Sequence, residues 1–179
     1  MIMDKEFICI SRFLKKRPTG FLYNSVISIL ENMVEKRSKL NTYKAQLRKK
    51  SGFESEAKIR DFSITIDEPE RLGGTNKGPN PVEVLLASLG GCLDFTGTII
   101  AQEMGYQLTD FELEIEGDLD PRGVTGKADV PIGFQQVRVD VKNVDGIPEE
   151  KLPEFIEKIQ KRCPVDNTLE EGVEIEFKQ

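Results

Sequence analysis

Three cysteines, Cys9, Cys92 and Cys163, are the side chains in this sequence best suited to redox or nucleophilic chemistry. The chain has no histidine, which excludes Cys-His and Ser-His-Asp catalysis within it and removes the commonest transition-metal ligand. The cysteine count is odd and no Cys-x-x-Cys occurs, which is untypical of secreted disulfide scaffolds and of zinc or thioredoxin motifs. We therefore expect a reducing, cytoplasmic setting in which one or two thiols are used chemically.

Cys92 and Cys163 are either buried packing residues or reacting thiols, and both interpretations are open at this point. Both lie in apolar helical patterns, and a free cysteine in such a place is usually a small buried hydrophobic residue. A reacting cysteine has to be a thiolate, and an apolar site raises the pKa of Cys92, so an Arg or Lys would have to offset that rise. Cys163 precedes Pro164, where its helix must stop and local unfolding is easy. For Cys9 we expect only a surface or packing role.

The charge of the 179 residues is unevenly distributed. Residues 1–39 hold eight Lys/Arg and four Asp/Glu, whereas the rest of the chain holds 17 and 27. The whole chain is acidic, with a net charge of −6, which argues against nucleic acid as its main partner. Five apolar residues of the basic segment share one helical face: Leu22, Val26, Ile29, Leu30 and Met33. We interpret residues 1–40 as a basic amphipathic helical extension that packs on protein rather than on a membrane, and expect no membrane insertion and no signal peptide.

The hydrophobic pattern of residues 41–179 predicts an α+β domain with antiparallel sheets and two long buried helices. Strands are predicted over 43–50, 53–66, 111–117, 137–141 and 173–177, and helices over 80–105 and 152–163. Asn80, Pro81 and Glu83 have the types and spacing of a helix N-cap with a capping box. Gly90 and Gly91 lie inside that helix, where we expect another backbone to pass close by. Since the helix is apolar on most of its surface, a dimer would bury it most economically.

Two long motifs carry a resemblance to a known family. The first runs from Leu72 to Cys92, LGGTNKGPNPVEVLLASLGGC, and the second from Cys163 to Leu169, CPVDNTL. Together with the links GDLDPRG at 117–123 and PIGF at 131–134, they resemble the OsmC and organic hydroperoxide resistance family over residues 41–179.

The resemblance implies an OsmC-like fold in an intertwined homodimer with the two long helices at its centre. It implies a cysteine-based peroxidase in which a hydroperoxide oxidises Cys92 to a sulfenic acid and Cys163 then closes a disulfide. An external dithiol, in one branch of the family a dihydrolipoyl group, reopens that disulfide, and no bound cofactor or metal is needed. The substrate would be an organic hydroperoxide and, less well, hydrogen peroxide.

The sequence departs from the family pattern at two supporting positions. The family's glutamate directly follows the proline of the Asn-Pro pair, but here Val82 has that place and Glu83 comes one residue later. Glu83 is therefore either a helix cap or the carboxylate that orients an arginine. The thiolate-stabilising arginine is not in the expected glycine-rich motif, which leaves Arg48 and Arg60 as candidates. A non-catalytic OsmC-like binding protein and a thiol redox sensor are the alternative functions.

Overall fold

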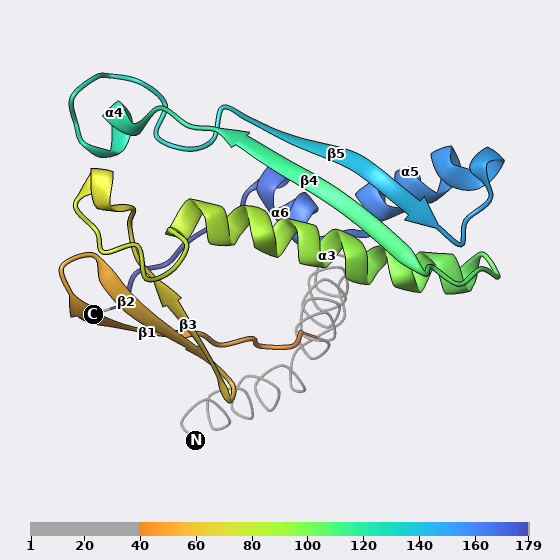
Figure 1. Ribbon diagram of the computed structural model, residues 1–179, viewed down its shortest axis with the longest axis horizontal. Coiled ribbons are helices and arrows are strands. Elements are labelled where there is room, and N and C mark those ends of the chain that lie inside the picture. The colour runs from red at the N-terminus through yellow and green to blue at the C-terminus, as the bar shows by residue number, and fades with distance from the viewer. Residues whose placement is uncertain (1–39, 179) are drawn as a thin grey trace, which may run out of the picture. The chain divides into compact units, whose positions relative to one another are not determined.

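The computed structural model describes residues 40–178, so the predicted N-terminal helix and Cys9 lie outside the described part of the chain (Figure 1). Residues 45–178 belong to one folded unit. Its main elements are strands β1 (Gln46–Ser51), β2 (Glu54–Ile59) and β3 (Phe62–Ile66), helix α3 (Pro81–Glu103), strands β4 (Asp110–Asp118) and β5 (Gln136–Asp145), and helices α5 (Leu152–Arg162) and α6 (Pro164–Glu171). The shorter helices are η1 (Glu70–Leu72), α4 (Pro121–Val124) and η2 (Glu149–Lys151).

The first sheet is antiparallel with the order β1-β2-β3. The prediction of a single strand over 53–66 was wrong, because the chain turns at Arg60 and Asp61 and forms two strands there. Arg60 adopts φ 55°, a left-handed conformation that permits the tight turn although no glycine marks it. Its guanidinium lies over the ring of Phe62, 5.1 Å from the centroid.

One face of this sheet is apolar and is left largely uncovered by the part of the chain that the structure describes. The register aligns Leu47 with Ala57 and Ala57 with Ile64, and Phe62 lies on the same side as Ile64. Phe62 is 62% exposed and Leu47 is 67% exposed. A soluble chain rarely leaves such a face open to water, which indicates that another surface covers it.

The loop from β3 to α3 is organised around one buried carboxylate, Asp67, which is 1% exposed. Its oxygens accept hydrogen bonds from the Thr75 hydroxyl at 2.6 Å and from the backbone N–H groups of Glu68, Thr75 and Lys77. The Lys77 ammonium also binds Glu54 of β2 at 2.6 Å. These bonds tie the loop to the sheet and fix the chain where it enters α3.

Asp67 should make the protein sensitive to acid. The Thr75 hydroxyl bond, followed by the backbone N–H bonds, lowers the pKa of Asp67 from 3.8 to about 2. A carboxyl with a lowered folded-state pKa stabilises the fold above pH 4, and that stability is lost as the pH falls from 4 through 2. We expect Asp67→Asn to lower the unfolding midpoint at pH 7 and the difference from wild type to shrink by pH 2.5, measured by urea denaturation. Asp129→Asn, at an exposed loop position, is the matched control, and an Asp67→Asn protein as stable as wild type at pH 7 would contradict the role.

Helix α3 begins as predicted. The Asn80 side chain accepts from the Glu83 N–H at 2.9 Å, and the Glu83 carboxylate accepts from the Asn80 N–H at 2.8 Å, which completes the capping box. Within residues 40–178 the prediction of a close backbone at the two glycines was wrong: a Cβ at Gly90 would lie 2.8 Å from the Ile115 side chain of β4, and one at Gly91 would meet no described atom within 4 Å. By length and composition alone α3 could cross a membrane, a property that core helices of soluble proteins share.

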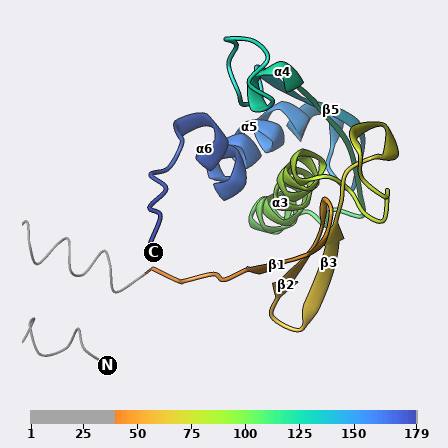
Figure 2. The same cartoon turned by 90° about the vertical axis from the view of Figure 1, so that its left-hand side faces the viewer.

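The main core lies where α3, α5, α6 and the β4-β5 pair meet (Figure 2). Strands β4 and β5 pair antiparallel and form a second sheet whose outer face is charged, since Arg138 bridges Glu116 and Asp118. The inner residues of this pair pack on the buried cluster of α3 and α5. Phe155 of α5 is fully buried and meets Phe111 of β4 edge-on, with ring centroids 5.8 Å apart.

The C-terminal part differs from prediction in two places. Pro164 was expected to end one helix, and it also begins another, because proline at the first helical position fits α6 once Cys163 is extended. The predicted strand over 173–177 is absent: residues 172–178 form no helix or strand in this chain. Val173, Ile175 and Phe177 alternate with charged residues and are exposed, and they pair with no strand in the described range 40–178.

Candidate active site

Cys92 lies in the fourth turn of α3. It is half-buried and shares a side of the helix with Leu85, Leu89 and Thr96, at i−7, i−3 and i+4. Leu89 and Thr96 are buried, whereas Leu85 is 37% exposed. The thiol therefore lies within a mostly apolar strip of α3 that runs from the core to the exposed Leu85.

Cys163 occupies the break between α5 and α6. Its backbone is extended, with φ −73° and ψ 114°, so it ends one helix and caps the start of the next. The residue has no exposed surface. It is the N-cap residue of α6, and the Val165 and Asp166 N–H groups at the start of that helix lower the pKa of its thiol.

The structure brings the two cysteines together although 71 positions separate them in the sequence. Cys92 packs against the buried cluster that contains Cys163, and the two thiols are neighbours. Both are free thiols. Burial raises the pKa of the Cys163 thiol, and the adjacent Cys92 raises it further, whereas the two α6 N–H groups act in the opposite direction. In the reduced protein Cys163 is therefore a protonated thiol beside a half-buried one, an arrangement able to close a disulfide.

The predicted supporting residues lie elsewhere. Glu83 is engaged in the capping box, nine residues before Cys92. Arg48 is on β1, opposite Glu56 of β2, and Arg60 is in the β2-β3 turn. Among residues 40–178, no hydrogen bond or ion pair joins either arginine to Cys92, and their role in stabilising a thiolate stays a prediction.

Sequence reasoning missed Asn167. Its side-chain N–H group donates to the carbonyl of Cys163 at 2.8 Å and to the carbonyl of Gln160 at 3.2 Å, and its backbone N–H also donates to Cys163. Asn167 thus spans the break that presents Cys163. The signal available in the sequence was its position four residues after Cys163, on the same side of a helix that starts at Pro164.

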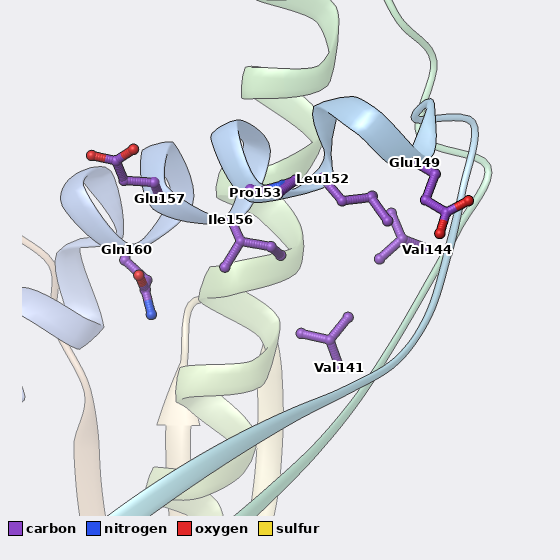
Figure 3. Close-up of a pocket in the computed structure, with 8 residues that line it drawn as sticks. All are labelled: Val141, Val144, Glu149, Leu152, Pro153, Ile156, Glu157 and Gln160. Carbon is purple, nitrogen blue, oxygen red and sulfur yellow. The ribbon is translucent and has the colours of Figure 1, made fainter.

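A second concave feature is separate from the cysteines. An open groove of about 600 Å³ lies between β5 and α5, and Figure 3 shows its lining side chains. Val141, Val144, Leu152 and Ile156 make its apolar part, with Glu149 and Glu157 at the rim. Neither cysteine lines it, so the groove is not the candidate peroxide site.

Comparisons with known proteins identify the family of the chain. The family model of OsmC-like proteins matches residues 74–178, more than half of the chain. Hydroperoxide reductases of Mycoplasma genitalium and Mycoplasma pneumoniae are 30% and 28% identical over 109 residues, which cover 61% of this chain and 73% of each relative.

Solved structures agree on the fold. An OsmC-like protein from Mycoplasma pneumoniae superposes with a TM-score of 0.59 at 24% identity, over 74% of this chain and 89% of that one. An organic hydroperoxide resistance protein OsmC from Legionella pneumophila gives 0.57 at 20% identity, over 73% and 90%. The α+β class with antiparallel sheets and central helices is confirmed. With its family model matched and its fold shared, the chain belongs to the OsmC family.

Proposed function

We propose that this chain is a thiol-dependent peroxidase that reduces organic hydroperoxides and, less well, hydrogen peroxide. The observation that carries the proposal is the meeting of Cys92 and Cys163 in one apolar cluster, one half-buried and the other fully buried. The two relatives named hydroperoxide reductase support the same activity. The mostly apolar strip that contains Cys92 favours a substrate with an alkyl or aryl group.

The reaction follows ordinary thiol oxidation chemistry. The Cys92 thiolate attacks the outer oxygen of ROOH, the O–O bond breaks, and an alcohol leaves after taking up a proton. Cys92 becomes a sulfenic acid, and the Cys163 sulfur then displaces its oxygen as water and closes the disulfide. An external dithiol, for which we propose a dihydrolipoyl group, reduces the disulfide to the two thiols and becomes a disulfide itself.

A steady-state assay tests the proposal. The purified protein should consume cumene hydroperoxide when dihydrolipoamide or dithiothreitol is present, and consumption should stop when the dithiol is omitted and the protein has turned over once. Hydrogen peroxide should be consumed with a lower kcat/KM. No turnover by folded protein with either reductant would contradict the proposed peroxidase activity.

We also propose that the working form is a homodimer in the cytoplasm. The uncovered apolar face of the β1-β3 sheet supports a second copy as the covering surface. The exposed side of α3 supports it too. A Cβ at Gly91 would contact no atom of residues 40–178, and Phe95 is 63% exposed. In such an assembly the cation beside Cys92 would be Arg48 or Arg60, and Glu83 is the candidate carboxylate to orient it.

A charge on the apolar face should break the dimer. Phe62→Glu places a carboxylate among apolar side chains that the partner would bury, at a large cost in free energy. Ser63→Glu is the matched control, because Ser63 is next in β3 and lies on the opposite face. Light scattering after size exclusion should give a dimer for wild type and Ser63→Glu and a monomer or aggregate for Phe62→Glu. A dimeric Phe62→Glu would place the interface elsewhere.

A further inference from the structure

The two sulfurs of the candidate site differ in how a second molecule can reach them. Cys92 is half-buried, whereas Cys163 has no exposed surface. Thiol–disulfide exchange requires an incoming thiolate to reach one sulfur while the other leaves, and access decides which sulfur is attacked. In a disulfide between them, only the Cys92 sulfur faces the side from which a reductant can arrive.

Cys163 is the N-cap residue of α6, so the unpaired N–H groups of the first helical turn lie next to it. The Val165 and Asp166 N–H groups lower the pKa of the Cys163 thiol and offset part of the rise that burial causes. Burial is the larger effect, so the released Cys163 takes up a proton, and access to the two sulfurs sets the polarity of the disulfide.

Asn167 holds this geometry in place. Its side chain bonds the carbonyl of Gln160 in α5 and the carbonyl of Cys163 at the break, so it joins the end of one helix to the start of the next. The hydroxyl of its neighbour Thr168 donates to the Pro164 carbonyl of the same helix, at 2.7 Å. The Asn167 bonds hold the Cys163 backbone at the break, which keeps its side chain in the buried cluster and away from an incoming thiolate.

We propose that the Cys92–Cys163 disulfide opens with a fixed polarity, in which the reductant attacks Cys92, Cys163 is the leaving group, and Asn167 is the positioning residue. This rests on the proposed function. The first reductant thiolate forms a bond to the Cys92 sulfur while the S–S bond breaks, and its electron pair goes to Cys163, which takes up a proton. The second thiolate of the dithiol then attacks its own sulfur in the mixed disulfide, so the reductant leaves as a cyclic disulfide and Cys92 leaves as a thiolate.

Trapping the mixed disulfide tests the polarity. A Cys9→Ser protein is oxidised with diamide, treated briefly with limiting 2-mercaptoethanol, quenched with acid and alkylated, and peptide mass spectrometry locates the adduct. We expect mercaptoethanol on Cys92 and the alkyl label on Cys163, in at least about ten-fold excess over the reverse. Equal labelling, an adduct mainly on Cys163, or no Cys92–Cys163 disulfide after diamide overturns the inference. Diamide forms the disulfide without a hydroperoxide, so the polarity and the peroxidase activity are tested separately. An adduct on Cys92 in a protein that consumes no peroxide would refute the proposed peroxidase activity and support the proposed polarity.

Three variants test Asn167. In diamide-oxidised protein, Asn167→Leu should slow the reduction of the Cys92–Cys163 disulfide by dihydrolipoamide about ten-fold. A change of that size is expected from the loss of roughly one hydrogen bond. Asn167→Thr should recover part of the rate, because a threonine hydroxyl can donate to the carbonyl four residues earlier. Thr168→Val, which removes a bond inside α6 only, should leave the rate unchanged, and Cys92 alkylation by iodoacetamide in reduced protein should be the same in all three. An unchanged rate in Asn167→Leu, or an equal fall in Thr168→Val, overturns the positioning role.

Discussion

Replacing Cys92 with serine should reduce hydroperoxide consumption to the rate measured without protein. A serine hydroxyl does not ionise near neutral pH and is not oxidised by a hydroperoxide, so neither the sulfenic acid nor the disulfide can form. The measurement is cumene hydroperoxide consumption with dihydrolipoamide, followed for wild type and for Cys92→Ser at equal concentration. Circular dichroism should show an unchanged fold, because the hydroxyl is nearly the size of the thiol and the position is only half-buried.

The matched variant Cys163→Ser separates the two thiols. Cys92 should still be oxidised once by the hydroperoxide, and dimedone should trap its sulfenic acid, but disulfide-dependent turnover with the dithiol should be lost. Cys9→Ser should behave as wild type. Full turnover by Cys92→Ser would show that Cys92 takes no part in the reaction. Rapid disulfide formation without multiple turnover in wild type would instead identify a redox sensor.

Phe155→Ala should strongly lower the free energy of unfolding. The phenyl ring is fully buried, contacts Phe111 edge-on, and lies against Gly97 of α3, where a Cβ would be 3.4 Å from its outer carbon. Removing a buried aromatic ring loses the transfer free energy of its carbons and leaves a cavity, which costs about 3–5 kcal/mol. Urea denaturation followed by circular dichroism should show a lower midpoint with a similar slope.

The same variant should affect the site, since Phe155 and Ile159 anchor α5 against α3 and α5 ends at Cys163. We expect slower closure of the Cys92–Cys163 disulfide after a single oxidation, with little change in the oxidation of Cys92 itself. Val124→Ala is the control, because Val124 is 72% exposed and its loss should change the free energy of unfolding by less than about 0.5 kcal/mol. A Phe155→Ala protein as stable as wild type would mean that α5 is held mainly by other contacts.

The sequence alone was sufficient for elements whose signals are local. The Asn80 cap, the proline after it and Glu83 specified the start of α3, and the alternation of residues 111–117 and 137–141 specified the β4-β5 pair. Two motifs were enough to indicate the family, because each places a cysteine in a characteristic run of residues. Local signals failed where no glycine or proline marked the turn, as at Arg60, and where proline both ends one helix and begins another, as at Pro164.

Only the tertiary structure decided how the two thiols differ. Spacing in the sequence does not say which sulfur is buried, because burial depends on how α3 packs against α5 and α6. Nor does it show that Cys163 is the N-cap residue of α6 or that Asn167 spans the helix break, since both follow from the extended backbone at that single residue. The predicted strand over 173–177 shows the converse. Its alternation was read correctly as a residue pattern, but a strand exists only where another strand supplies hydrogen bonds, and within residues 40–178 no strand pairs with it.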